Sequence, residues 1–287
     1  MGTLPDIGVI DLMMGTKAPD AGQYRFLAPQ LRDAGSRDMA FPAGYMFKDV
    51  PSGEDHLEGA ALLLPQMDRF GVDKALINVS GDNAAALAAM EEHPDRFIAS
   101  FQVDPNTGMD GVRALVDAHR RWGVRAATAF PAGYLPQVPI SDRRMYPIYA
   151  KCVELGIPII LNAGVPGPRV PMACQDVAHL DEVCYDFPEL TVVMRHGAEP
   201  WEDLAVKLMI KWPGLHYATS GFAPRYYPQA IIDYANTRGA DKILYAGYFP
   251  MGLSLERIFS ELPDVPLAAH VWPKFLRLNA ERVLGLD

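Results

Sequence analysis

The stretch "LTVVMRH" (residues 190–196) is a short apolar run that ends in two basic residues, Arg195 and His196. Its apolar side chains follow one another without polar alternation, which is typical of a parallel strand buried on both faces. Seven further runs of this kind are spread along the chain: "DIGVIDL" (6–12), "KALINVS" (74–80), "FIASFQVD" (97–104), "VRAATAF" (124–130), "IPIILNA" (157–163), "LHYATSG" (215–221) and "KILYAG" (242–247). The sequence therefore predicts eight buried strands.

The stretches between these runs have helical spacing. In "DGVRALVDAHRRWG" (110–123) the apolar positions fall on one stripe, and Gly123 is a typical residue for a helix end. A second helix is predicted from Ser141 or Asp142 to Gly156, with Pro147 interrupting it. Eight alternating units predict a single α/β domain over residues 1–287, a (β/α)8 TIM barrel. The alternative, an open doubly wound sheet, lacks a glycine-rich loop after the first strand.

Residues 13–57 form a long connection after the first predicted strand. This segment is rich in Gly, Pro, Asp and Met and is too long for a simple turn. It contains side chains that can pack, namely Tyr24, Phe26, Phe41, Tyr45 and Phe47. Because TIM barrels carry their sites at the C-terminal ends of the strands, we expect the segment to lie over the catalytic face and shape a pocket.

Charge and composition narrow the choice of partners. The net charge is −9 at pH 7, without a cluster of Lys and Arg, which disfavours nucleic acid and anionic membranes. The N-terminus does not resemble a secretory signal, no apolar run could span a bilayer, and the three cysteines have no CxxC spacing. We therefore expect a reduced, cytoplasmic protein with a small-molecule substrate, and a homodimer as its oligomeric state.

Four segments in their order along the chain resemble the amidohydrolase-related family, which includes aminocarboxymuconate-semialdehyde decarboxylase. They are "HPDRFIASFQVDPNTG" (93–108), "DFPELTVVMRHGAEPW" (186–201), "NTRGADKILYAGYFPM" (236–251) and "LRLNAERVLGLD" (276–287). The resemblance implies a TIM barrel with a catalytic metal ion at the C-terminal ends of its strands. It also implies metal ligands from a His-x-His on the first strand, a His on the fifth and an Asp on the eighth.

The sequence departs from this ligand pattern at four positions. Met13 and Gly15 stand in the two positions of the His-x-His motif, Asn162 in that of the fifth-strand His, and Tyr248 in that of the Asp. Glycine has no donor side chain, a thioether is too soft for hard divalent ions, and an amide oxygen is neutral. Tyrosine binds a metal only as phenolate, far from its ordinary pKa. We therefore predict no metal ion and no cofactor.

Two residues of the family pattern are retained, Asp11 of the first motif and His196 at the end of the sixth strand. His196 alone cannot hold a metal ion tightly, since a catalytic zinc site takes about three protein donors. A relocated metal site that uses His56 or His179 remains an alternative, although no pair of histidines has the spacing of a metal motif.

The retained and replaced residues give a candidate catalytic set. His196 is the expected acid–base group, because an imidazole ordinarily titrates near neutral pH. Asn162 and Tyr248 are expected to donate hydrogen bonds to a developing oxyanion. Asp11 joins the catalytic set, although support of the first strand is an alternative role for it.

The residues expected to bind substrate are Arg195, Glu199, Arg169, Met13 and Ser220. Arg195 is the candidate for a substrate carboxylate, with pairing to Glu199 as the alternative. An apolar wall is expected if Met13, Met14, Met172 and Met251 converge.

Three functions are compatible with these residues. The favoured one is a hydrolase or C–C lyase, decarboxylase-like, that acts on a small acyl or aromatic-derived carboxylic substrate without a metal through His196. The second is a metal-dependent amidohydrolase or decarboxylase with atypical ligands. The third is a non-catalytic pseudoenzyme that binds a small molecule or a partner. The number of polar residues expected at the strand ends favours the first.

Overall fold

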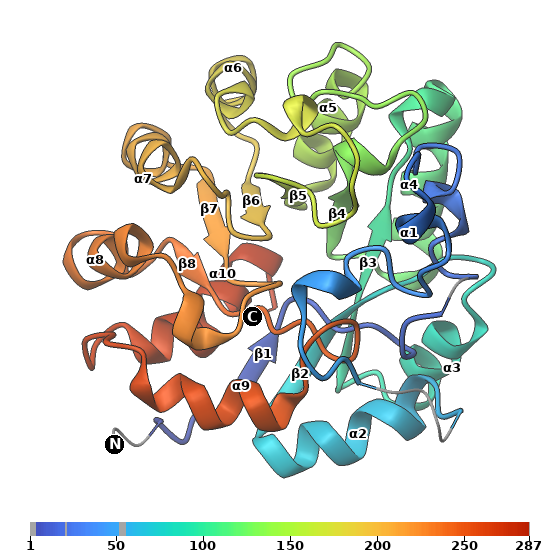
Figure 1. Cartoon of the computed structure of the whole chain (residues 1–287). Coiled ribbons are helices and arrows are strands. Elements are labelled where there is room, and N and C mark those ends of the chain that lie inside the picture. Colours follow the sequence, from blue (N-terminus) through green and yellow to red (C-terminus); the bar gives the residue numbers. More distant parts are fainter. Residues whose placement is uncertain (1–3, 21, 52–55, 287) are drawn as a thin grey trace.

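Each of the eight predicted runs overlaps a strand, and every strand pairs in parallel with the next one along the chain (Figure 1). A computed structural model describes residues 4–20, 22–51 and 56–286. The strands are β1 (Val9–Asp11), β2 (Val72–Asn78), β3 (Phe97–Gln102), β4 (Ala126–Ala129), β5 (Ile159–Asn162), β6 (Val192–Arg195), β7 (Leu215–Ala218) and β8 (Ile243–Leu244). With helices around them, they form the predicted TIM barrel.

The helices lie mainly outside the ring of strands (Figure 1). They are α1 (Ala34–Arg37), α2 (Gly59–Phe70), α3 (Ala84–Glu92), α4 (Met109–Trp122), α5 (Tyr146–Leu155), α6 (His179–Asp186), α7 (Glu202–Lys211), α8 (Gln229–Thr237), α9 (Leu255–Glu261) and α10 (Asn279–Leu284). The predicted start of α5 at Ser141 or Asp142 is wrong. Pro147 lies in the first turn, where a missing N–H costs no helical hydrogen bond, and therefore does not interrupt the helix.

The interior of the barrel is filled by one apolar cluster. Each strand contributes a buried side chain to it: Ile10, Leu76, Ile98, Ala126, Ile160, Val193, Ala218 and Leu244. Ala280, Val283 and Leu284 of α10 belong to the same cluster and close the barrel at the end where the strands begin. Complete burial of a large aliphatic side chain stabilises a fold by about 1.5–3 kcal/mol, so this cluster anchors the C-terminal helix to the barrel.

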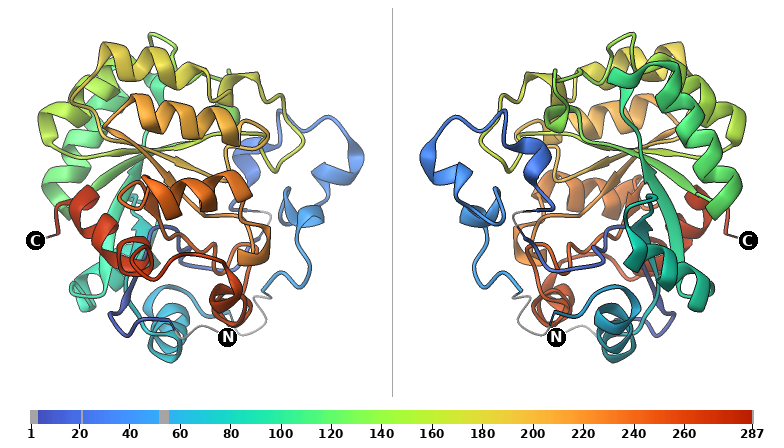
Figure 2. Two further views of the ribbon diagram at one scale, coloured as in Figure 1. Left: turned by 90° about the vertical axis from the view of Figure 1, so that its left-hand side faces the viewer. Right: turned by 90° about the vertical axis from the view of Figure 1, so that its right-hand side faces the viewer.

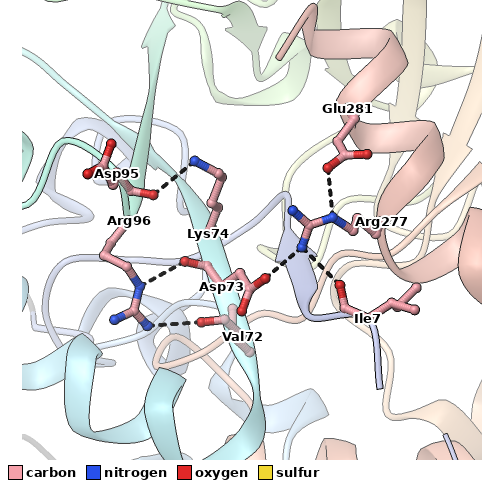
Figure 3. A network of polar contacts seen from close by, with 8 residues as sticks. All are labelled: Ile7, Val72, Asp73, Lys74, Asp95, Arg96, Arg277 and Glu281. Carbon is pink, nitrogen blue, oxygen red and sulfur yellow. Dashed lines mark hydrogen bonds and ion pairs between the residues drawn. The ribbon is translucent and has the colours of Figure 1, made fainter. Parts of the chain in front are cut away.

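Polar contacts also connect chain segments at the end of the barrel where the strands begin (Figure 3). Arg277 donates hydrogen bonds to Asp73 at 2.6 Å, to Glu281 at 2.7 Å and to the carbonyl oxygen of Ile7 at 3.0 Å. Arg96 donates to the carbonyl oxygens of Val72 and Asp73. An open depression of about 490 Å³ lies beside Arg96 and Asp73. Since it is at the N-terminal ends of the strands, it is on the face where TIM barrels carry stability rather than catalysis.

The long connection between β1 and α2 lies at the opposite end of the barrel from α10 (Figure 2). We call its described residues 13–20, 22–51 and 56–57 the cap segment. Gln30 donates to the carbonyl oxygens of the loop after β4, and Tyr45 donates to the carbonyl oxygen of Gly167 at 2.8 Å. The cap segment therefore covers the C-terminal ends of the strands, as predicted. Within the described residues, no helix has the length and apolar character needed to cross a membrane.

Candidate functional site

A cavity of about 750 Å³ lies between the cap segment and the C-terminal ends of the strands. Its floor follows from strand alternation, because a residue two positions after an interior side chain also points inward. Five strands change from apolar to polar in that step, in the pairs Leu76 and Asn78, Ile98 and Ser100, Ala126 and Thr128, Ile160 and Asn162, and Val193 and Arg195. The barrel interior is thus apolar toward the N-terminal ends of the strands and polar toward their C-terminal ends, where it meets the cavity.

Arg195 and His196 both line this cavity, although neighbouring residues of a strand point in opposite directions. The strand β6 ends at Arg195, and His196 has a φ of +67°, in the left-handed region. This conformation is uncommon for a residue with a side chain and turns the imidazole toward the same space as the guanidinium. The next residue, Gly197, has a φ of +91°, and a Cβ there would lie 2.3 Å from the ring of Phe222.

Arg195 is buried, with 8% of its surface exposed. Its Nε–H donates a short hydrogen bond to Oδ1 of Asn162, and its Nη1–H donates to the sulfur of Met13 at 3.2 Å. Over residues 4–20, 22–51 and 56–286 it forms no ion pair with a carboxylate. Burial lowers the pKa of Arg195 to about 10, so the guanidinium remains charged at neutral pH. The alternative pairing with Glu199 is not formed.

Ser220 forms two polar contacts with His196. The Ser220 Oγ accepts the backbone N–H of His196 at 3.2 Å and lies 3.1 Å from the imidazole Nδ1. Burial, and then the charge of Arg195, lower the pKa of His196 to about 3. The prediction that His196 titrates near neutral pH is therefore wrong, because the imidazole is buried beside the charged guanidinium of Arg195. At neutral pH the imidazole is uncharged.

Tyr248 contacts His196 and the cap segment. Its ring meets the edge of His196 at a centroid distance of 5.2 Å and stacks on Phe47 at 5.6 Å. Phe41 packs against both Phe47 and Tyr248, and Tyr24 packs against Phe41. We call Tyr24, Phe41, Phe47 and Tyr248 the aromatic wall. Burial raises the pKa of Tyr248 to about 12, so its hydroxyl is a hydrogen-bond donor at neutral pH.

Asp11 is completely buried and is not among the residues that line the cavity. Its Oδ1 accepts the backbone N–H groups of Met13 at 2.9 Å and Gly247 at 2.8 Å. Its Oδ2 is buried without a hydrogen-bond partner among the described residues. Burial raises the pKa of Asp11 to about 7. This geometry agrees with the alternative role, support of the first strand, rather than with contact to a substrate.

The remaining predicted residues divide between the cavity and its surroundings. Met13 and Glu199 line the cavity, and Glu199 is exposed at its rim. Partial loss of solvent around the Glu199 carboxyl, and then the charge of Glu202, raise the pKa of Glu199. Ser220 lies behind His196, and Arg169 pairs with Asp33 of the cap segment at 2.9 Å. Of the methionines, Met13, Met14 and Met251 line the cavity, whereas Met172 does not and is exposed.

Several cavity residues were not singled out from the sequence: Gln102, Phe130, Gln175 and Phe222. A signal existed for Gln102, which continues the alternation of Ile98 and Ser100 along β3. The other three lie outside the strands, where no such alternation applies.

The residues that converge here do not fit a metal ion. The Asn162 oxygen and the Met13 sulfur already accept hydrogen bonds from a guanidinium, and a divalent cation beside it would be repelled. Among the described residues, no three His, Cys, Asp or Glu side chains are placed to share a metal ion. His56 is exposed on the cap segment, and His179 lies 3.0 Å from the Ser141 hydroxyl, outside the cavity.

A barrel of eight parallel strands with a polar cavity at their C-terminal ends defines the TIM-barrel class of protein. Within this class, the family model described as Amidohydrolase matches residues 32–286, and the chain belongs to that family.

Solved structures share this fold over nearly the whole chain. An uncharacterized TIM-barrel protein from Bordetella bronchiseptica is 24% identical, with a TM-score of 0.76 over 96% of this chain and 98% of its own. A 5-carboxyvanillate decarboxylase from Novosphingobium aromaticivorans, complexed with manganese and 4-hydroxy-3-methoxy-5-nitrobenzoic acid, is 17% identical, with a TM-score of 0.69 over 96% of both chains. A 4-oxalomesaconate hydratase from Rhodopseudomonas palustris is 17% identical, with a TM-score of 0.60 over 96% of this chain and 95% of its own. No curated protein sequence matched the chain.

Proposed function

We propose that the protein is a hydrolase or C–C lyase, decarboxylase-like, that acts on a small acyl or aromatic-derived carboxylic acid without a bound metal ion. His196 is the acid–base group. The observation that carries this proposal is the placement of Arg195 and His196 at one cavity, on the face where TIM barrels perform catalysis. Support comes from the similar decarboxylase and hydratase structures, whose names indicate carboxylic acids as substrates or ligands.

The imidazole of His196 is uncharged at neutral pH and can therefore accept a proton, for example from a water molecule that attacks an acyl carbon. A bound anionic substrate offsets the charge of Arg195, which is the second cause of the low pKa, and so increases the proton affinity of His196. Ser220 fixes the orientation of the ring. The Tyr248 hydroxyl and the Asn162 amide N–H group are donors for negative charge that develops on the substrate oxygen.

The test is turnover by protein treated with a chelator, measured on aromatic and aliphatic carboxylic acids, their esters and their lactones. We expect turnover without added metal, and we expect His196→Gln to reduce it by about 10²–10⁴-fold. His270→Gln is the matched control, because His270 is exposed and does not line the cavity. Turnover that chelation abolishes and manganese restores would support the metal-dependent alternative. Binding without any turnover would support the pseudoenzyme.

We also propose that the protein works as a homodimer in the cytoplasm. Two-fold dimers are the commonest symmetric assemblies, and the three cysteines are free and buried, which suits a reducing compartment. Light scattering of the purified protein at several concentrations tests the first statement. Localisation of a tagged chain tests the second.

A further inference from the structure

The guanidinium of Arg195 is a buried positive charge without a negative partner in the described part of the chain. A buried charge is costly unless an opposite charge compensates it, and native proteins nearly always provide one. The acidic residues that line the cavity do not do so. Glu58, Asp82 and Glu199 are all exposed at its rim, and Asp82 accepts a hydrogen bond from Ser80.

The neighbours of Arg195 are also uncharged. Burial raises the pKa values of Tyr134 and Tyr248, so both remain phenols at neutral pH. Asn162 contributes a neutral amide and Met13 a neutral thioether. The floor of the cavity therefore has a net positive charge that comes from a single side chain.

Two contacts fix the plane of the guanidinium and leave part of it free. An arginine has five N–H donors, and the described residues accept two of them, the Nε–H by Asn162 and one Nη1–H by Met13. A sulfur atom is a weak acceptor, so Met13 competes poorly with an oxygen. The remaining donors belong to the two terminal nitrogens of a side chain that lines the cavity. Such a planar edge matches the two oxygens of a carboxylate.

We propose that Arg195 is the built-in cation of this site: it binds the carboxylate of the substrate at the floor of the cavity, in place of a metal ion. This inference rests on the proposed function for the class of substrate, but it does not depend on turnover. It also sets the orientation of the ligand. The carboxylate of the ligand points toward the barrel axis, and the apolar remainder of the ligand lies against the aromatic wall, where Phe47 stacks on Tyr248.

Asn162 offers a sharp test, because aspartate has nearly the same shape and keeps the oxygen that accepts from Arg195. The variant Asn162→Asp supplies the missing negative charge from within the protein and should therefore displace an external anion. We would measure binding of benzoate and of benzamide, its neutral counterpart, by calorimetry. The proteins would be the wild type, Asn162→Asp, Arg195→Met and His196→Gln. Arg113→Met is the control, since Arg113 pairs with Asp110 on the exposed face of α4.

We expect the wild type to bind benzoate at least about tenfold more tightly than benzamide, as expected for one charged contact at a desolvated site. This preference should disappear in Asn162→Asp and Arg195→Met and persist in His196→Gln and Arg113→Met. Circular dichroism would confirm that each variant is folded. A second measurement is bromide soaked into crystals and located by anomalous scattering. We expect bromide beside Arg195 in the wild type and no bromide there in Asn162→Asp.

Equal binding of benzoate and benzamide by the wild type would overturn the inference, as would undiminished benzoate binding by Asn162→Asp. Absence of both benzoate binding and bromide beside Arg195 would overturn it as well. An anion bound at Arg195 in a protein that converts no carboxylic acid would support the inference and contradict the proposed activity. Turnover of carboxylic acids by a protein whose Asn162→Asp variant keeps full benzoate affinity would support the proposed activity and contradict the inference.

Discussion

The Oδ1 atom of Asp11 accepts the backbone N–H of Gly247 at 2.8 Å and so connects the end of β1 with the segment that follows β8. The two ends of the sheet meet here, and the Leu12 N–H also donates to the Tyr245 carbonyl oxygen at 3.3 Å. The carboxyl group that makes this connection is completely buried. Its protonation state therefore affects the stability of the whole barrel.

We expect Asp11→Asn to stabilise the protein at high pH but not at low pH. The pKa of Asp11 is raised from 3.8 in the unfolded chain to about 7 in the folded one, so ionisation opposes folding. This cost is absent below the unfolded pKa, grows between about pH 4 and pH 7, and is then constant. An asparagine keeps the oxygen for both backbone N–H groups and does not ionise. The free energy of unfolding should exceed that of the wild type by on the order of 4 kcal/mol at pH 8.

Urea denaturation at pH 4, 6 and 8 measures this difference. Asp117→Asn is the control, since Asp117 is exposed on α4. A difference between Asp11→Asn and the wild type that does not change with pH would contradict the assignment of Asp11 as the buried ionising group.

The support that Asn162 gives to Arg195 should be visible in stability. We expect Asn162→Leu to lower the free energy of unfolding by about 1.5–3 kcal/mol, because the Nε–H of a buried cation loses its acceptor. Met13→Leu removes the weaker sulfur acceptor at similar volume and should cost about 1 kcal/mol or less. Urea denaturation at pH 7 compares the two variants. Equal losses would mean that the amide oxygen does not hold the guanidinium.

The charge of Arg195 should be measurable at His196 by NMR. In the wild type we expect the imidazole to stay neutral from pH 8 to pH 4, since its pKa is lowered to about 3. Arg195→Met should raise that pKa but leave it below the ordinary value, because burial is the larger cause. Addition of benzoate to the wild type should act in the same direction. A pKa of His196 that neither change affects would show that the two side chains are not electrostatically coupled.

The same depressed pKa also has a consequence for acid stability. A histidine that is protonated more easily in the unfolded chain stabilises the fold above pH 6.5, and this stabilisation is lost as the pH falls toward 3. His196→Gln should therefore flatten the decline of stability between pH 6 and pH 4 relative to the wild type. Thermal unfolding across this range is the measurement, and an unchanged slope would contradict burial of the imidazole.

Arg169 should act on the cap segment rather than on the substrate. It pairs with Asp33 at 2.9 Å, and its guanidinium lies 4.6 Å from the centre of the Tyr45 ring. We expect Arg169→Ala to speed hydrogen exchange in residues 30–50 and to lower stability by only about 0.2–1 kcal/mol, as for other exposed ion pairs. Benzoate affinity should change less than in Arg195→Met. A larger loss of affinity with unchanged exchange would restore the predicted substrate-binding role.

The order of the eight strands could be predicted because each is marked by its own apolar run, and parallel pairing buries both faces of such a run. The polar floor of the cavity could also be anticipated at Asn162 and Arg195. Their use at one site with His196 was also expected from the sequence. The left-handed backbone that turns the His196 side chain into the cavity could not be predicted, because no glycine marks that position. The low pKa of His196 also depends on burial beside Arg195, which arises only when the chain is folded.

The cap segment supplies most of the aromatic wall from one continuous piece of chain, while the charged floor comes from strands β5 and β6. Most of the aromatic wall and most of the charged floor are therefore encoded by separate parts of the chain, and Met13 of the cap segment contacts Arg195. Insertions or substitutions between β1 and α2 can change the shape that is recognised without disturbing the pairing of a single strand. Evolution, or a protein engineer, can vary the preferred substrate body in this barrel independently of the group that holds its negative end.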